Sequence, residues 1–305
     1  MNENIKKIIF AILFLASFTP WVGGPLALLF GFIMAILIGN PYSAFTKDLS
    51  GRLLKASVVG LGFGMNLEQA METTGDAFYI TIISIASVLI LGFLLGKLLG
   101  IEKKLSHLIA TGTAICGGSA IAAVAPIVDA NDDEKTLSLG TIFILNSIAL
   151  FIFPYLGELL IMSNQEYGIW TAIAIHDTSS VVGAAEVLGD IPLKIATTVK
   201  LSRALWIIPV ALLSSFLFKS KGSKIKIPWF ILYFILALVL NTLLPQFQEY
   251  FTTIYTISRK GLVVTLFLIG SGISLSQIKN VGFKPMLLGV ILWVIVSVGS
   301  YYLIV

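Results

Sequence analysis

Apolar segments follow one another along this chain from Ile8 to Val305, and this succession limits the folds open to it. A helix needs about 20 mainly apolar residues to cross the hydrocarbon core of a bilayer, and several segments are close to that length. Lipid cannot solvate free backbone groups, so helices are predicted throughout. The segments lie near residues 8–21, 25–40, 53–67, 77–99, 106–128, 136–155, 168–188, 193–217, 228–245, 258–276 and 284–304.

The composition, and the spread of apolar residues from Ile8 to Val305, favour one membrane domain over a soluble domain with a single anchor. Only 12% of the 305 residues are charged and 57% are hydrophobic, whereas soluble domains carry about 25% charged residues. We therefore predict one all-α polytopic membrane domain over residues 1–305, with about 9–11 transmembrane segments. The net charge of +4 comes from short basic loops, so no nucleic-acid partner is expected. Cys116 is the only cysteine, which excludes an internal disulfide.

Two of the segments, 106–128 and 168–188, are interrupted by small and polar residues. TAICGGSAIAA begins at Thr113 and AIHDTSSVVGAA begins at Ala174, and a shift of 60 positions places Ser119 over Ser179. Loose backbone at membrane depth is tolerated only inside protein or beside a water-filled cavity. Matching interruptions in two halves of a chain are typical of the binding site of a transporter.

A second internal sequence repeat relates a segment near the start of the chain to one near its end. Val58–Gln69 resembles Leu266–Gln277 after a shift of 208 positions, including a Gly-x-Gly in each. Because the two segments run in opposite directions by their flanking charges, we predict inverted repeats at about 25–155 and 168–305, preceded by an extra helix at 8–21. The segments at 106–128 and 168–188 are then either broken helices that cross the membrane or re-entrant hairpins. The hairpins are favoured, because they make the two interrupted segments inverted mates.

Lysine and arginine gather in alternate connections, and cytoplasmic loops carry the excess of these residues. This pattern predicts a cytoplasmic N-terminus and an extracytoplasmic C-terminus. Arg259 and Lys260 lie on the other side and weaken the pattern without reversing it. The basic residues that support the prediction are Lys6, Lys7, Lys47, Arg52, Lys97, Lys103, Lys104, Lys219, Lys221, Lys224, Lys226, Lys279 and Lys284.

Three motifs carry a resemblance to a known family. GTAICGGSAIAA at Gly112–Ala123, AIHDTSSVVGAA at Ala174–Ala185 and GLGFGMNL at Gly60–Leu67 resemble the YeiH-type conserved bacterial membrane proteins, a family named for sulfate export. The resemblance covers nearly the whole chain. It implies a bacterial plasma-membrane protein that exports sulfate or a sulfonate. More distantly, it implies the inverted repeats of bile-acid-symporter-like and cation/proton-antiporter-like transporters.

The first interrupted segment offers backbone groups to a substrate. Cys116, Gly117, Gly118 and Ser119 allow a turn that exposes amides, and a helix that begins there directs its positive end toward an anion. The alternative is a patch of small residues where helices pack closely.

The second interrupted segment offers side chains. His176 and Asp177 are candidates for coupling transport to protons, because ionisable residues within a membrane segment usually face a cavity or a partner. Thr178, Ser179 and Ser180 are candidate substrate ligands. The alternative is a hydrogen-bonded lock between two hairpin tips. Adjacent His, Asp and Ser side chains diverge on a helix, so no hydrolase triad and no enzyme is expected.

Three further residues complete the predicted site. Arg203 is the preferred cationic substrate ligand or a counter-ion to Asp177, and Lys200 lies one turn away as a coupling residue. Both side chains could instead extend to the membrane interface. Asn146 is a substrate ligand or a polar contact between helices. No metal-ligand spacing or nucleotide fingerprint occurs, so neither a metal nor a cofactor is expected.

The leading hypothesis is therefore a secondary transporter of a small anion, a sulfate or sulfonate exporter that works by alternating access and is coupled to protons. One alternative is a cation/proton antiporter that uses Asp177 and His176, and another is a passive channel or scaffold. The expected partners are the small anion, membrane lipid and a coupling proton or cation. A homodimer is expected by analogy with elevator-type carriers alone.

Overall fold

The structure, a computed structural model, describes residues 3–218, 229–272 and 282–305. It is 85% helical, and no strand occurs in those residues, which confirms the predicted all-α class. The predicted total of 9–11 membrane segments stays a prediction.

The helices have the following bounds in chain order: α1 Glu3–Ala16, α2 Gly24–Ile33, η1 Met34–Ile38, α3 Ser43–Leu61, η2 Gly62–Gly64, α4 Leu67–Leu98, α5 Lys103–Ala114, α6 Gly118–Val124, α7 Asp132–Leu159, α8 Asn164–Ala174, α9 Thr178–Val187, α10 Asp190–Ala204, α11 Ile207–Leu217, α12 Trp229–Leu243, η3 Pro245–Phe247, α13 Gln248–Gly272 and α15 Phe283–Ile304.

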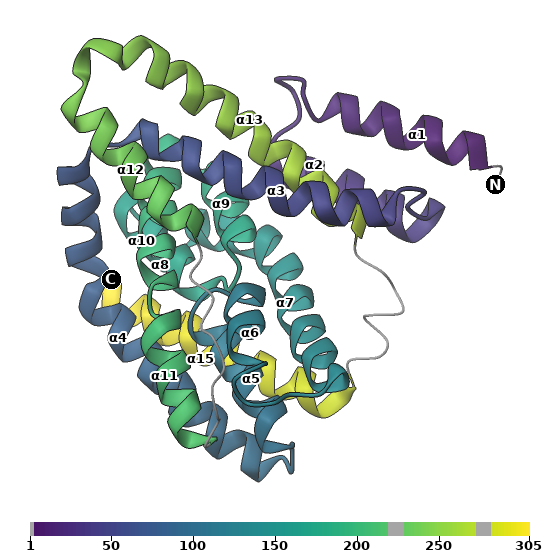
Figure 1. Cartoon of the computed structure of the whole chain (residues 1–305), viewed down its shortest axis with the longest axis vertical. Helices are drawn as coiled ribbons and strands as arrows, with labels where there is room; N and C mark the ends of the chain where they lie inside the picture. The colour runs from purple at the N-terminus through teal and green to yellow at the C-terminus, as the bar shows by residue number, and fades with distance from the viewer. Residues whose placement is uncertain (1–2, 219–228, 273–281) are drawn as a thin grey trace.

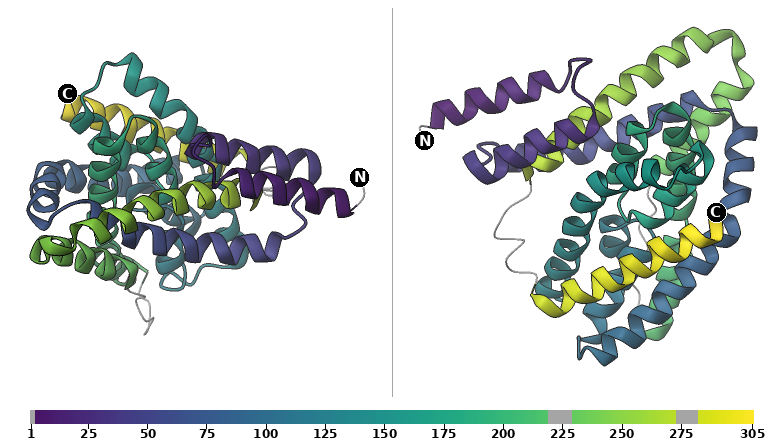
Figure 2. Two further views of the ribbon diagram at one scale, coloured as in Figure 1. Left: turned by 90° about the horizontal axis from the view of Figure 1, so that it is seen from above. Right: turned by 180° about the vertical axis from the view of Figure 1, so that it is seen from behind.

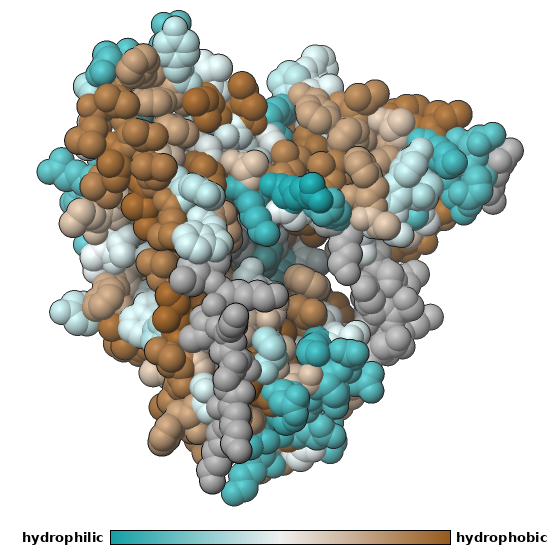
Figure 3. Space-filling model, viewed as in Figure 1, coloured by the Kyte–Doolittle hydropathy of each residue, from teal (hydrophilic) through white to brown (hydrophobic). Residues whose placement is uncertain are grey.

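Five helical stretches in the described residues are long and apolar enough to cross a membrane: Leu67–Leu98, Asp132–Leu159, Asp190–Leu217, Pro245–Gly272 and Phe283–Ile304. Shorter apolar helices occupy Leu26–Ile38 and Trp229–Leu243. Large apolar side chains are exposed along many of these helices, and Figure 3 shows broad hydrophobic areas on one face of the molecule. Such a surface suits lipid as its solvent.

The helices form two groups. In the first, α13 packs along both α2 and α3, and α1 lies beside them at one end of the molecule (Figures 1 and 2). α2 and α13 approach so closely that a Cβ on Gly31 would lie 2.2 Å from the carbonyl oxygen of Phe267. In the second group, α15 packs against α4, α5, α7 and α8, and α10 packs against α8 and α9.

Capping residues fix where the central helices begin. The Asn131 side chain accepts from the Glu134 amide at the start of α7, and the Glu134 carboxylate accepts from the Asn131 amide. Ser163 and Glu166 form the same reciprocal pair at the start of α8. These capping boxes satisfy amides that have no partner within the helix, so each start is specified locally by the sequence.

The first interrupted segment folds back on itself. α5 ends at Ala114, and α6 then returns along it, so that Gly112 lies against the Ile121 side chain. Near the two open ends, the Lys104 ammonium donates to the carbonyl of Asp129. Two residues so far apart in the chain meet only if the segment is a hairpin, called here hairpin 1.

The second interrupted segment is also a hairpin, called hairpin 2. The Tyr167 hydroxyl, near the start of α8, donates to the Ala184 carbonyl, near the end of α9, at 3.0 Å. Hairpin 1 opens beside the start of α7 and hairpin 2 opens just after its end, so the two enter from opposite ends of that helix. Figure 1 shows α5 and α6 in the lower half of the bundle and α8 and α9 in the upper half. Both interrupted segments are therefore hairpins in the structure, and their re-entrant placement in a membrane stays a prediction.

The full inverted repeats remain a prediction. Residues 273–277, part of the second internal repeat, lie outside the described residues. The same holds for several basic residues that support the predicted orientation, namely Lys219, Lys221, Lys224, Lys226 and Lys279.

Candidate functional site

The tips of the two hairpins meet beside the middle of α7, at a place called here the tip crossing (residues 115–119 and 175–180). A Cβ on Gly117 would lie 3.5 Å from Asp177, across the crossing, and 3.2 Å from the Ile142 side chain of α7. Gly117 has a φ of 60° and a ψ of −125°, a backbone conformation that side chains with a Cβ rarely adopt. The glycine is therefore needed both for the turn and for the contact between the tips.

Asn146 attaches hairpin 2 to α7. Its side-chain oxygen accepts from the backbone amides of His176 and Asp177 at 3.0 and 3.3 Å. Asn146 is 3% exposed, and its own amide nitrogen has no partner in the described residues. Asn146 was predicted as a substrate ligand or as a polar contact between helices. The structure places it in contact with the second tip.

Asp177 caps α9. Its carboxylate accepts from the amides of Ser179 and Ser180 at 3.1 and 3.3 Å and from the Ser179 hydroxyl. A carboxylate at a helix N-terminus is stabilised by the free amides and by the helix dipole. The positive end of α9 therefore already carries an anion from the chain itself. Asp177 has no ion pair within 4.0 Å among the described residues.

Lys200 and Arg203 lie on the other side of the crossing, on α10. Lys200 donates to the carbonyls of Ala172 and Ile175 at 3.1 and 2.7 Å. Arg203 donates through Nε to Ala114 and through Nη1 to Ile173, both at 2.8 Å. Both side chains are fully buried, with 0% exposure. They bind the carbonyls at the C-terminal ends of the two half-helices α5 and α8, so neither extends to the membrane interface.

The surface that a ligand could reach is narrower than the predicted set of residues. Ser119 is exposed, and Gly118, Asp177 and Ser180 are partly exposed. Residues Cys116, Gly117, His176, Thr178 and Ser179 are buried. The exposed and partly exposed residues of the tip crossing, called here its accessible face, therefore offer hydroxyl groups, a small-residue backbone and one carboxylate.

His176 contributes its backbone to the contact with Asn146, but its ring is fully buried. Neither ring nitrogen has a hydrogen-bond partner in the described part of the chain, and the hydroxyls of Thr111 and Thr113 on α5 are also unpaired there. The two threonines were not predicted, because a threonine in an apolar helix commonly bonds to its own backbone. Most buried polar groups in proteins have a partner, so these unpaired groups need an explanation, such as a functional role.

A second polar cluster, also not predicted, joins the two groups of helices. Arg259 on α13 forms ion pairs with Asp190 at the start of α10 and, at 3.5 Å, with Glu186 on α9. Glu186 lies inside the apolar segment 168–188, and this acidic residue was the signal that could have indicated a partner.

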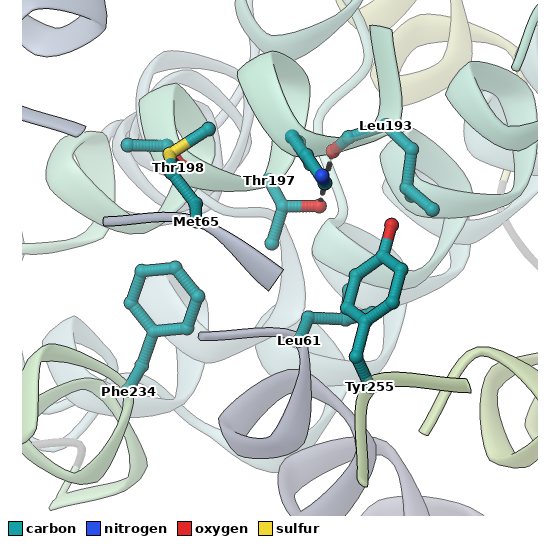
Figure 4. Close-up of a pocket in the computed structure, with 8 residues that line it drawn as sticks. Leu61, Met65, Leu193, Thr197, Thr198, Phe234 and Tyr255 are labelled. Carbon is teal, nitrogen blue, oxygen red and sulfur yellow. Dashed lines mark hydrogen bonds between the residues drawn. The ribbon is translucent and has the colours of Figure 1, made fainter. Parts of the chain in front are cut away.

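A small cavity lies between α3, α10, α12 and α13, and none of the residues that line it belongs to the tip crossing (Figure 4). Its volume is about 10 Å³, and its lining includes Thr197, Thr198, Met65 and Tyr255. The Thr197 hydroxyl donates to the Leu193 carbonyl at 2.7 Å, and the Thr198 hydroxyl to the Met65 sulfur at 3.3 Å. This space holds about one water molecule, so it is too small for a substrate.

Comparisons with known proteins agree on one family. The family described as conserved hypothetical protein 698 matches residues 8–289. A UPF0324 membrane protein from Bacteroides thetaiotaomicron is 51% identical over 94% of this chain and 87% of its own length. Relatives with the same description from Photobacterium profundum and Shewanella oneidensis are 50% and 48% identical, over 96% and 98% of this chain and 90% and 94% of their own lengths. No solved structure matches.

Proposed function

We propose, from the premise that the chain belongs to the UPF0324 family of membrane proteins, that it is a secondary transporter of a small anion. The proposed substrate site is the accessible face of the tip crossing, and the mechanism is alternating access. The family membership agrees with the resemblance to the YeiH-type proteins. The more distant relation to symporters and antiporters stays a prediction.

The observation that carries the proposal is the balance of charge at the tip crossing. Two buried basic side chains, Lys200 and Arg203, accompany a single carboxylate, Asp177. The half-helix ends contribute partial charges of both signs, which offset one another because two C-terminal and two N-terminal ends meet there. A buried excess charge is unfavourable unless a partner approaches, so the crossing favours an incoming anion.

The accessible groups suit an oxyanion. Ser119 and Ser180 offer hydroxyl donors, and Gly118 lets a ligand approach the backbone. Because Asp177 is partly exposed and repels an anion at close range, we place the substrate on the hairpin 1 side of the crossing. Sulfate or a small sulfonate is the proposed substrate class, and no bond of the substrate is broken.

The opposed hairpins support alternating access. A substrate at the tips lies near the middle of α7, and each hairpin opens toward a different end of that helix. Small relative movements of the hairpins against the α2, α3 and α13 group would expose the tips first to one side and then to the other. Coupling to protons is proposed at Asp177 and His176.

The test is flux into proteoliposomes. We expect saturable uptake of labelled sulfate, sulfite or a taurine-like sulfonate, and faster uptake when a proton gradient is imposed. Ser119→Ala is expected to raise the half-saturating concentration, whereas Ser147→Ala, whose hydroxyl bonds to Phe143 of its own helix, is the matched control. The absence of saturable flux for every small anion would refute the proposal. A conductance far above the turnover of a carrier would indicate a channel.

A second candidate, a cation/proton antiporter, is favoured by one observation. The Asp177 carboxylate is partly exposed and has no ion pair in the described residues, so it could exchange a proton for a cation. Asp177→Asn would then abolish cation-dependent proton release. If proton movement in the Asp177→Asn variant instead depends only on anion flux and not on added cations, the antiporter is excluded.

The proposed location is the bacterial plasma membrane, with the N-terminus in the cytoplasm and the C-terminus outside. Hairpin 1 then opens toward the cytoplasm near Lys103 and Lys104, and hairpin 2 opens outside near Glu166. Reporter fusions at the two termini test this orientation. A homodimer is proposed by analogy only, and the mass of the detergent-solubilised protein tests it.

A further inference from the structure

Four backbone carbonyls at the C-terminal ends of α5 and α8, next to the tip crossing, accept from side chains of α10 and are called here the carbonyl cluster. α5 and α8 both end here, and the last carbonyls of a helix have no partner within it. The four that converge on α10 belong to Ala114, Ala172, Ile173 and Ile175. In transporters with broken helices, carbonyls at the C-terminal ends of half-helices coordinate Na⁺ or another coupling cation.

In this chain the cluster is already filled by cations on α10. The Lys200 ammonium takes two of the carbonyls and the Arg203 guanidinium takes the other two, at 2.7–3.1 Å. Both side chains are completely buried. Because they are three residues apart, Lys200 and Arg203 lie on one face of α10. From this single helix they reach backbone carbonyls beside the tips of both hairpins.

Their geometry argues against direct contact with the substrate. Two donors of each side chain are bonded to backbone, and the accessible residues of the crossing are Gly118, Ser119, Asp177 and Ser180. Arg203 Nη2 has no partner in the described residues, but it is buried as well. Lys200 and Arg203 therefore bind carbonyls at the helix ends without reaching the residues that a substrate would contact.

We propose that Lys200 and Arg203 are tethered substitutes for a soluble coupling cation. The carbonyl cluster is a monovalent-cation site that the chain fills with its own side chains, so no metal cation binds there in the native protein. Shortening either side chain opens a site for a soluble cation of matching chemistry: an alkylammonium or alkali-metal ion for Lys200 and guanidinium for Arg203. Only the coupling consequence, transport that is independent of sodium, rests on the proposed function.

The test compares melting temperatures of purified protein in sodium, potassium or choline chloride at constant ionic strength. The wild-type protein is expected to melt at the same temperature in all three salts. Lys200→Ala is expected to melt lower and to recover with methylammonium or sodium. Arg203→Ala is expected to recover with millimolar guanidinium and not with urea. A bound ion at 100 times its dissociation constant raises the melting temperature by about 5 °C.

Lys194→Ala is the matched control on the same helix. The Lys194 ammonium lies 5.3 Å from the centre of the Tyr255 ring and is not at the carbonyl cluster, so no cation is expected to restore this variant. Saturable stabilisation of the wild-type protein by sodium or potassium would overturn the proposal, even if the variants fail to fold. Folded variants that no cation stabilises would also overturn it.

The flux assay separates this proposal from the proposed function. If the protein transports anions, wild-type flux should be equal in sodium and choline media, and methylammonium should restore flux to Lys200→Ala. A protein without any flux would refute transport but leave the melting experiment decisive for the cation site.

Discussion

Replacing Asn146 by leucine tests whether α7 holds hairpin 2 in place. The substitution keeps a similar volume but removes the oxygen that accepts from the His176 and Asp177 amides at 3.0 and 3.3 Å. A buried donor left without a partner costs about 1–3 kcal/mol. Asp177 is partly exposed and its hydrogen bond to Asn146 is the longer one, so leaving its amide without a partner costs less free energy than at His176. We therefore expect a loss of about 2–4 kcal/mol in the free energy of unfolding.

The assay is thermal unfolding of the purified protein, with hydrogen exchange at the two amides. For a chain of this length 1 kcal/mol corresponds to ~2 °C, so the melting temperature should fall by about 4–8 °C. Exchange at His176 and Asp177 should become faster, and anion flux should be lost because the tip moves. Asn146→Asp keeps an acceptor and should retain more stability, and Ser147→Ala is the neighbouring control. If Asn146→Leu melts within 2 °C of the wild type, or no lower than the control, this reasoning is wrong.

Three other perturbations have expected outcomes. Gly31→Ala places a methyl group against the backbone of α13, so it should prevent correct packing and sharply lower the yield of folded protein. Gly51→Ala, where no atom of the described residues lies within 4 Å of the new methyl group, should express normally. Arg259→Ala leaves the largely buried Glu186 without its cation; the melting temperature should fall by several degrees, and the additional change Glu186→Gln should recover part of that loss. The thiol of Cys116 is 2% exposed, so a maleimide should label it only after denaturation; rapid labelling of native protein would show that the hairpin 1 tip opens.

Although α3 begins at Ser43 and α13 at Gln248, ahead of the predicted apolar segments at 53–67 and 258–276, the sequence was sufficient to predict the all-α class and the two interruptions. These features depend on local patterns, namely apolar length and the small residues at Cys116–Ser119 and Thr178–Ser180. The capping residue Asp177 also has a local signature, because aspartate before a helix accepts from its first amides.

The partners of the buried cations could not be predicted in this way. Arg203 was expected to bind substrate or to pair with Asp177, yet in the structure it donates to the carbonyls of Ala114 and Ile173. A backbone carbonyl is present in every residue, so nothing in the sequence distinguishes the ones that Arg203 contacts. Arg259 and Glu186 are 73 residues apart and meet only because α9 and α13 pack together. Such pairings depend on tertiary structure.

Because Asn146 is central in α7, the length of this helix fixes where its side chain meets hairpin 2. The helix has 28 residues, hairpin 1 opens beside its first turn, hairpin 2 opens after its last, and Asn146 lies near its midpoint. Each inserted residue would lengthen the helix by 1.5 Å and turn everything beyond it by about 100°. One insertion before Asn146 would therefore point its side chain away from the hairpin 2 tip, while leaving both hairpins intact. Length changes among relatives should consequently fall in the connections and spare α7.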